Sequence, residues 1–128
     1  MNEGCIFCGF EKGKDREILF SSKSLIAVQD AYPVTPGHIL IITKKHRNDF
    51  FELNGIEYRE LQSMILLAVD FITSEGLSPE GYNIGMNCGS AGGQTIMHFH
   101  CHVIPRYSGD MKEPRGGVRH CVAGKGNY

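Results

Sequence analysis

Tryptophan is absent from the chain, and no run of apolar residues is long. The longest apolar run, residues 64–69, falls far short of the roughly 20 residues that a helix needs to cross a bilayer. The first four residues, Met-Asn-Glu-Gly, lack the charged and apolar regions of a signal peptide. We therefore expect a cytoplasmic protein that makes no contact with a membrane.

The chain also has little net charge, because 13 lysines and arginines face 14 aspartates and glutamates. This balance argues against a protein that binds nucleic acids through a broad charged face. From Arg106 onward, basic residues outnumber acidic ones, and this basic tail either serves an anionic ligand or is simply solvated. Without a secretory signal, the five cysteines are better interpreted as thiols or metal ligands than as disulfides.

The order of expected elements predicts one α+β domain that spans residues 1–128. Strands are predicted at 17–20, 24–30, 38–43 and 82–87, and a polar loop at 12–16. A short helical turn is expected near residues 49–51. The long helix should begin at an Asn54 cap, with Glu57 completing a capping box, and should end at Gly76. Pro105 is expected to end the last strand.

Three histidines alternate with apolar residues between positions 98 and 103. Strict alternation is typical of a β-strand with two unlike faces, so His98, His100 and His102 are predicted to share one face. A glycine-rich loop, residues 87–95, precedes them. Three alternating histidines can bind a metal, or one imidazole can act as a nucleophile while its neighbours hold the ligand. The loop favours the nucleophile, because Gln94 and Thr95 offer donors for phosphate oxygens.

Two further features of the sequence allow more than one interpretation. Cys5 and Cys8 form a Cys-x-x-Cys pair, which is half of many zinc sites, although a redox pair or two unrelated cysteines have the same pattern. Asp30 closes a predicted strand, where its carboxylate could bind the two hydroxyls of a ribose or cap a turn.

The stretch from His98 to Ile104 resembles the His-φ-His-φ-His-φ-φ motif of the histidine triad (HIT) family of nucleotide hydrolases and transferases, where φ is apolar. The resemblance extends in the family's order over most of the chain, through Cys5-x-x-Cys8, Asp30, Pro36-Gly37-His38, Lys44-Lys45-His46, Asn87, Gly92-Gly93-Gln94-Thr95 and Pro105-Arg106. The tail at 114–119 is more similar to the dinucleoside polyphosphate (Fhit and Ap4A-processing) side than to the phosphoramidase (Hint) side. A HIT-like fold implies a five-stranded antiparallel sheet with one long and one short helix.

The resemblance also implies roles for individual residues. His100 would attack the α-phosphorus of a nucleotide and form a nucleotidyl-histidine intermediate, and His102 would contact the phosphate and help the leaving group. His38 would lie behind the triad. The remaining ligand contacts would come from Asp30 at the ribose and from Asn87, Gly93, Gln94 and Thr95 along the phosphates.

A zinc ion is implied by the members of the family that carry one. Its ligands would be Cys5, Cys8, His46 and His98, a closed tetrahedral set that is structural and not catalytic. The resemblance further implies a homodimer whose two sheets join, and a Mg²⁺ ion could accompany a polyphosphate substrate. Cys88 and Cys101 match no family role and are expected to be ordinary thiols.

The expected activity is cleavage of a phosphoanhydride, as in a diadenosine polyphosphate, with release of a nucleoside monophosphate. Within the same chemistry, the chain could instead be a purine-nucleoside phosphoramidase. A third possibility is a nucleotide-binding regulatory module without turnover, but a complete triad argues against it, since a pure binder needs no nucleophile.

Overall fold

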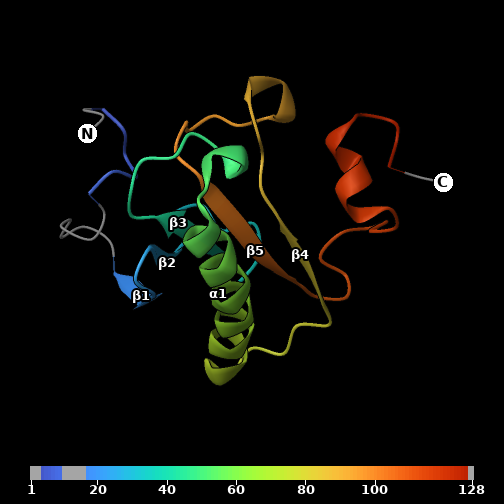
Figure 1. The fold of residues 1–128 in the computed structure, drawn as a ribbon. Coiled ribbons are helices and arrows are strands. Elements are labelled where there is room, and N and C mark those ends of the chain that lie inside the picture. The colour runs from blue at the N-terminus through green and yellow to red at the C-terminus, as the bar shows by residue number, and fades with distance from the viewer. Residues whose placement is uncertain (1–3, 10–16, 127–128) are drawn as a thin grey trace.

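The computed structural model describes residues 4–9 and 17–126, and the loop predicted at 12–16 lies outside them. The described chain forms one antiparallel sheet and one long helix (Figure 1). The sheet order is β1-β2-β3-β5-β4, with β1 Ile18–Ser21, β2 Leu25–Gln29, β3 Ile39–Thr43, β4 Gly81–Gly85 and β5 His100–Arg106. The predicted α+β fold with a five-stranded antiparallel sheet is confirmed.

β3 is the middle strand, and all five of its residues are buried. Such a continuous apolar run is typical of a strand that is covered on both faces. β3 pairs with β5 so that Leu40 lies opposite His102 and Ile42 opposite His100. The two histidines of β5 therefore lie beside the buried central strand of the sheet.

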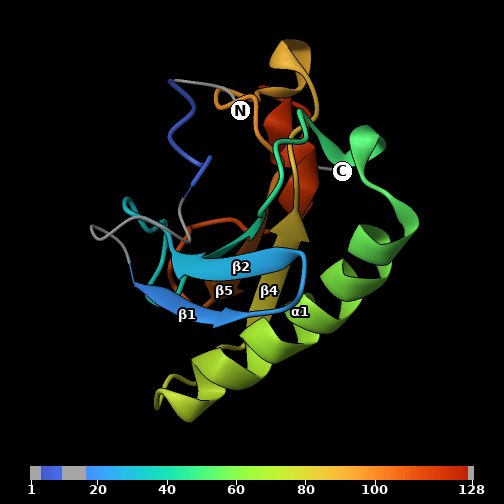
Figure 2. The same cartoon turned by 60° about the vertical axis from the view of Figure 1, so that its left-hand side comes forward.

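Helix α1, Gly55–Ser74, begins with the predicted capping box. The Asn54 side chain accepts a hydrogen bond from the Glu57 N–H at 2.8 Å, and the Glu57 carboxylate accepts one from the Asn54 N–H at 2.8 Å. Beyond the helix, Gly76 has a φ of 88°, a left-handed conformation that suits glycine. α1 lies along one face of the sheet (Figure 2).

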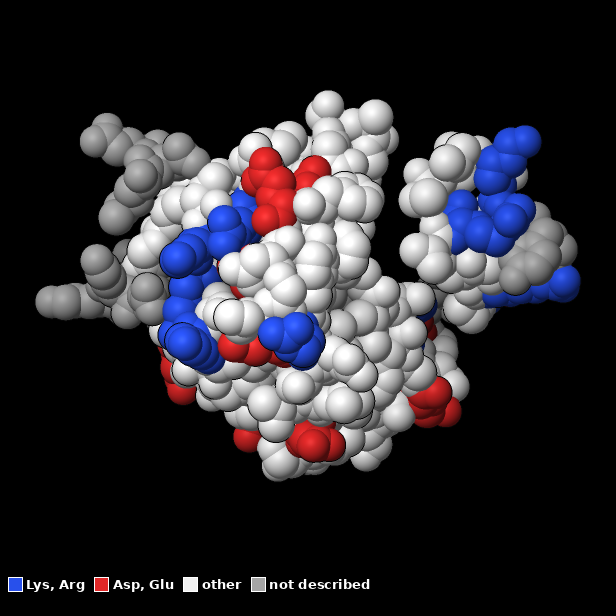
Figure 3. All heavy atoms as spheres, in the orientation of Figure 1, with Lys and Arg blue, Asp and Glu red and all other residues white. Residues whose placement is uncertain are grey.

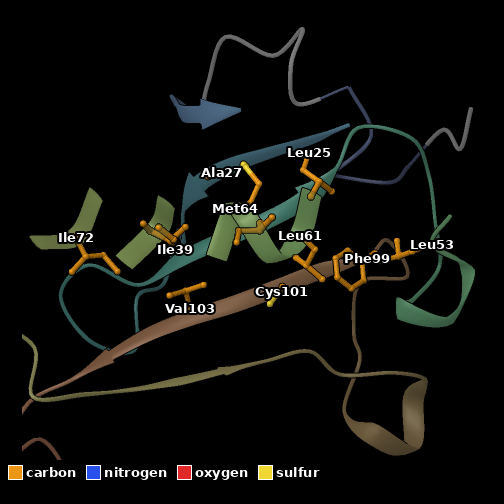
Figure 4. Packing of buried hydrophobic residues seen from close by; sticks show 12 residues of the cluster. Leu25, Ala27, Ile39, Leu53, Leu61, Met64, Ile72, Phe99, Cys101 and Val103 are labelled. Carbon is orange, nitrogen blue, oxygen red and sulfur yellow. The ribbon is translucent and has the colours of Figure 1, made fainter. Parts of the chain in front are cut away.

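Different segments of the chain pack on the two faces of the sheet. On one face, residues of α1 such as Leu61, Met64 and Ile72 pack on residues of β2, β3 and β5 (Figure 4). On the opposite face, Phe7 from the N-terminal segment packs on a cluster that contains Ile26, Val28, Leu40 and Ile42. His100 and His102 lie on this second face, because Cys101 and Val103 of β5 belong to the helix-side core.

Two predictions at the histidine strand are wrong. β5 begins at His100, so His98 lies in a bend before it, where the Phe99 N–H donates to the Arg47 carbonyl at 2.6 Å. Pro105 lies inside β5, opposite Tyr82, and the strand ends at Arg106. Proline removes one donor but keeps the backbone extended. The carbonyl of Pro105 accepts the Thr35 hydroxyl at 2.6 Å.

The shorter elements largely follow the sequence. A 3-10 helix at Phe50–Glu52 confirms the predicted turn, and β4 replaces the strand predicted at 82–87. The C-terminal segment, for which no element was predicted, contains a 3-10 helix at Gly117–Cys121. Lysine and arginine side chains gather on this segment, which stands apart from the body of the molecule in Figure 3. Within the described residues, no helix is both long and apolar enough to span a membrane.

Candidate functional site

A cavity of about 310 Å³ lies against the sheet face that carries the two histidines of β5. Six residues that were predicted to bind a nucleotide line it together: Asp30, Asn87, Gly93, Thr95, His100 and His102. The rest of its wall is mostly apolar and comes from Ile6, Phe7, Ala31, Tyr32, Leu40 and Ile96. A wall that combines polar and apolar side chains suits a ligand with a charged group and a flat apolar group, such as a nucleotide.

The His100 ring is held in one tautomer. Its Nδ1 lies 2.9 Å from the carbonyl oxygen of His98, and a carbonyl only accepts hydrogen bonds, so Nδ1 carries the proton. The other ring nitrogen, Nε2, therefore has a free lone pair in the neutral imidazole. An oriented lone pair at a cavity wall is what a nitrogen nucleophile needs.

A chain of hydrogen bonds fixes the tautomers of His38 and His102. The Val34 N–H donates to His38 Nδ1 at 3.1 Å, so the proton of neutral His38 sits on Nε2. That Nε2–H donates to His102 Nδ1 at 2.9 Å, which leaves the proton of His102 on its Nε2. His102 thus offers an N–H donor in the cavity. His38 does not line this cavity itself but contacts two residues that do, His102 and Asp30, and its catalytic role stays a prediction.

Both rings of this chain are neutral at pH 7. Burial lowers the pKa of His38, although the carboxylate of Asp30 opposes the shift. Burial lowers the pKa of His102 to about 4, and the neighbouring His100 and His38 rings add to the effect. The same tautomers argue against a metal ion between Asp30, His38 and His102, because the Nε2 of His38 that would face the ion carries a proton.

Asp30 has two contacts that bear on its predicted roles. One carboxylate oxygen accepts the Tyr32 N–H at 2.8 Å, which is the turn-capping role. The other lies 3.5 Å from His38 Nε2, and the residue also lines the cavity. The cap and a ligand contact are therefore compatible, because a carboxylate has more acceptor sites than the turn uses.

Gln94 fixes the shape of the glycine loop. Its side-chain oxygen accepts the Gly89 N–H at 2.8 Å, and its side-chain nitrogen donates to the carbonyls of Asn48 at 2.5 Å and Ile96 at 3.0 Å. The loop turns through Gly93, whose φ of 94° favours glycine. Gln94 thus positions its neighbours Gly93 and Thr95, and its direct contact with phosphate stays a prediction.

The four predicted metal ligands come together although they are far apart in sequence. The ligand atoms of Cys5, Cys8, His46 and His98 all lie within 4.8 Å of one another. Cys8 Sγ lies 3.2 Å from His46 Nδ1 and 3.4 Å from His98 Nδ1, and Cys5 Sγ lies 3.3 Å from His98 Nδ1. Two thiolates and two imidazoles are a typical tetrahedral zinc set.

The hydrogen bonds at the Nε2 atoms of His98 and His46 are consistent with a metal ion bound at their Nδ1 atoms. The Nε2 of His98 lies 2.7 Å from the Thr43 carbonyl and that of His46 lies 3.0 Å from the Asn48 side-chain oxygen. Each Nε2 therefore carries the proton, and each Nδ1 is free to bind an ion. Such second contacts are the usual way in which proteins orient metal-bound histidines. Burial lowers the pKa of His98, which favours the neutral form that binds metals.

Sequence reasoning missed the loop that joins these two sites. Its carbonyls at Arg47 and Asn48 receive hydrogen bonds from Phe99 and Gln94, while His46 faces the metal site. The Arg47 side chain donates to both oxygens of Glu57 at 3.0 and 3.1 Å, and Glu57 is buried. A glutamate predicted only as a helix cap thus also anchors this loop, and only its burial could have revealed that.

A second hollow adjoins the cavity and shares two of its residues, Asn87 and His102. Its volume is also about 310 Å³. The remaining wall is largely apolar and includes Val34, Ile84, Met86, Ile104 and Val118.

The basic tail takes little part in the walls of these two cavities. Arg106, its first residue, pairs with Asp110 at 2.6 Å and with the Asn83 side chain at 2.6 Å.

Residues 11–109 match the HIT domain. An uncharacterised HIT-like protein of Mycoplasma genitalium is 38% identical over 106 residues, which cover 80% of this chain and 73% of that protein. An AP-4-A phosphorylase of Mycobacterium tuberculosis is 34% identical over 94 residues, which cover 73% of this chain but only 48% of the relative.

Solved structures agree with this assignment. A HIT family protein of Bacillus anthracis superposes with a TM-score of 0.78 at 33% identity, covering 86% of this chain and 78% of the other. A HIT family hydrolase of Clostridium thermocellum gives 0.71 at 30% identity, covering 88% and 98%. A zinc-bound histidine triad protein of Mycobacterium smegmatis gives 0.74 at 29% identity, covering 86% and 80%.

Proposed function

The chain belongs to the HIT domain family, and on this premise we propose that it is a nucleotide hydrolase or transferase. Its substrate is a phosphoanhydride such as a diadenosine polyphosphate, which it cleaves at the α-phosphorus. The reaction passes through a nucleotide bound covalently to His100 and releases a nucleoside monophosphate. The observation that carries the proposal is the free Nε2 of His100 in a cavity lined by both polar and apolar residues.

In the first step, the lone pair on His100 Nε2 forms a bond to the α-phosphorus. The bond from phosphorus to the bridging oxygen breaks, and its electron pair leaves with that oxygen. The ring becomes positively charged while Nδ1–H keeps its hydrogen bond to the His98 carbonyl, a contact that stabilises the charge. In the second step, water adds to phosphorus, the N–P electron pair returns to His100, and the proton of water passes to solvent.

His102 favours a good leaving group. Because its pKa is lowered to about 4, the ring is neutral at pH 7, so it can donate a hydrogen bond from Nε2 but is not the acidic imidazolium that could protonate a leaving group. The oxygen of a polyphosphate leaves readily as an anion, whereas an amine must be protonated as it leaves. This difference supports an anhydride over the phosphoramidate that remains the alternative. The second hollow, which shares His102 and Asn87, gives room for a large leaving group.

The relatives also support a nucleotide hydrolase or transferase, but they do not identify its substrate. One is an AP-4-A phosphorylase, of which the matched region is about half, and one solved relative is a HIT family hydrolase. Water is the acceptor in the proposed reaction, and inorganic phosphate is the acceptor to compare with it. Mg²⁺ on the polyphosphate stays a prediction.

The zinc site and the dimer belong to the same proposal. Cys5, Cys8, His46 and His98 would hold one zinc ion, which supplies a cross-link between the N-terminal segment and the segment before β5. Two copies of the chain would pair through β4, which is an edge strand with Ile84 exposed. The expected compartment is the cytoplasm.

The deciding experiment compares two substrates. Purified protein is incubated with diadenosine tetraphosphate or with adenosine 5′-phosphoramidate, in the presence and absence of inorganic phosphate, and the products are separated. We expect AMP and ATP from the first substrate at the higher rate. Preference for the phosphoramidate would favour the alternative, and AMP binding without turnover of either would favour a regulatory module.

The His100→Ala variant tests the nucleophile. We expect it to lose turnover and the covalent intermediate while its affinity for AMP stays within about tenfold, or roughly 1.4 kcal/mol. His120→Ala is the matched control, because His120 is an exposed histidine of the C-terminal segment. Equal turnover in both variants would remove His100 from this role.

A further inference from the structure

Two residues of the cavity wall lie between two ligands of the metal site. Ile6 and Phe7 occupy the positions between Cys5 and Cys8, in a turn closed by a hydrogen bond from the Cys8 N–H to the Cys5 carbonyl at 3.3 Å. Both side chains line the cavity. The Phe7 side chain is buried, and Ile6 is 63% exposed at the rim. The segment that binds the metal and the segment that faces the nucleotide are therefore one short turn.

Phe7 also touches the reactive histidine. Its ring lies edge-on to the His100 ring, with centroids 5.0 Å apart and an interplanar angle of 77°. A second edge-on contact, at 6.0 Å and 89°, joins Phe7 to His98, which is itself a metal ligand. A shift of Phe7 would remove part of the apolar wall and at the same time loosen the packing around His100.

The position of this turn depends on contacts to segments that are far away in the sequence. Cys8 faces His46 and His98, and Cys5 faces His98, 93 residues further along. Bound metal would replace these contacts with bonds of about 2.0 to 2.3 Å to each ligand atom. Without an ion, the thiols are only weak hydrogen-bonding partners, and short segments near a terminus are poorly ordered unless something holds them down.

From these contacts we propose that occupancy of the Cys5, Cys8, His46 and His98 site controls nucleotide affinity. The ion holds Ile6 and Phe7 as the wall against which the apolar part of a nucleotide packs. When the ion is removed, this wall moves away while the sheet and α1 remain folded. The inference rests on the proposed function, since it concerns the same cavity, and it gives the metal site a role in binding as well as in stability.

The persistence of the fold follows from where the core lies. The larger cluster lies between α1 and the sheet and includes neither Ile6 nor Phe7. On the other face, Phe7 is one member of a cluster whose remaining buried residues come from β2 and β3. Loss of the turn therefore exposes one edge of the smaller cluster and leaves the main core in place.

The test measures AMP binding by calorimetry in three preparations: zinc-loaded protein, protein stripped with a chelator, and stripped protein reloaded with zinc. AMP is not a substrate of the proposed reaction, so the readout is independent of turnover. We expect the dissociation constant for AMP to rise about tenfold or more on stripping and to recover on reloading. Circular dichroism should show the same helix and sheet content in all three preparations.

Two variants distinguish the effect of the cavity wall on AMP binding from the effect of the ion. Ile6→Ser removes an exposed part of the wall but no ligand, so we expect weaker AMP binding with about one zinc ion per chain still bound. Cys8→Ser removes a ligand, and we expect it to lose zinc and affinity together. Cys121→Ser is the matched control, because Cys121 is an exposed cysteine on the C-terminal 3-10 helix and should change neither quantity.

Ribose 5-phosphate, which lacks the base, is the matched ligand. If the wall contacts the apolar part of the nucleotide, stripping should weaken AMP binding more than ribose 5-phosphate binding.

Equal AMP affinity with and without zinc would overturn the inference and leave the proposed function intact. Loss of the helix signal on stripping would also overturn it, since the ion would then support the whole fold. Failure of the zinc-loaded protein to bind AMP would instead count against the proposed function itself.

Discussion

At the scale of single residues, hydrogen bonds to backbone groups decide what each histidine can do. The carbonyls of His98 and Thr43 hold protons on His100 Nδ1 and His98 Nε2, which leaves a lone pair on the first ring for the proposed attack on phosphorus and one on the second ring for the proposed metal ion. Alternation and a glycine loop are visible in the sequence, and they pointed to these histidines as candidates. It could not predict the tautomers, since Thr43 is 55 residues from His98.

The His102 ring should make stability depend on pH. Its pKa is about 4 in the folded protein because the ring is buried, against an ordinary value of 6.5. Between these values the unfolded chain binds the proton more readily, so acidification through this window favours unfolding. Above 6.5 both states are neutral at this ring and the contribution is constant. We expect the free energy of unfolding to fall as pH drops from 6.5 towards 4.

Urea unfolding of the wild type and of His102→Asn, followed across this window, measures the effect. Asparagine keeps an acceptor for His38 but does not titrate, so its curve should be flatter than that of the wild type. The difference between the two curves cancels the proton dependence of the metal site, which both proteins share. Parallel curves would mean that His102 is not responsible.

At the scale of elements, the sequence predicted the ends of a helix or strand correctly where the residues that interact there are close together in the sequence. The capping box of Asn54 and Glu57 and the stop at Gly76 fix α1 within a few residues, and the sequence shows all three. The start of β5 could not be predicted in this way. His98 has the alternation of a strand residue, but the Arg47 carbonyl takes the Phe99 N–H that a strand would give to its neighbour.

Glu57 should be a sensitive position of α1 although it is a charged residue. Its buried carboxylate caps the helix and also pairs with Arg47, whose loop holds His46 and receives Gln94. Because Glu57→Ala breaks a buried ion pair and a cap together, we expect a loss of about 3 kcal/mol in the free energy of unfolding. Glu57→Gln should lose less, since its amide oxygen can still accept from Asn54.

Denaturant unfolding of the two variants checks this expectation. Glu75→Ala, at the exposed C-terminal end of the same helix, should change the free energy of unfolding by no more than about 0.5 kcal/mol. A Glu57→Ala variant as stable as that control would show that the pair with Arg47 contributes nothing.

At the scale of the whole molecule, the sheet is covered unevenly. α1 packs chiefly on β2, β3 and β5, while β4 forms one of the two edges and carries an exposed Ile84. Edge strands with exposed apolar side chains are places where a second chain can pair. The sequence alone predicted a dimer only through the family resemblance, because the order of strands in space is not visible in the alternation of any single strand.

We therefore expect sedimentation to give twice the mass of the chain, and Ile84→Lys to shift it towards the monomer. In the dimer, the lysine of one chain would lie near the same lysine of the second chain across the paired edges, and the two positive charges would repel each other. Leu66→Lys is the matched control, since Leu66 is an exposed leucine of α1, and it should remain a dimer. A wild-type monomer, or two variants that behave alike, would count against pairing through β4.

The spread of the metal ligands along the chain has a consequence for how the protein is made. Cys5 leaves the ribosome 93 residues before His98, its partner in the folded protein. At translation rates of about 5 to 20 residues per second, its thiol waits on the order of 5 to 20 s for that imidazole. During this interval the Cys5-x-x-Cys8 pair can meet oxidants or foreign metals before its own pocket exists. Loading of the proposed zinc site therefore competes with these reactions during synthesis, and cells under oxidative or metal stress should yield a larger share of newly made chains without the ion.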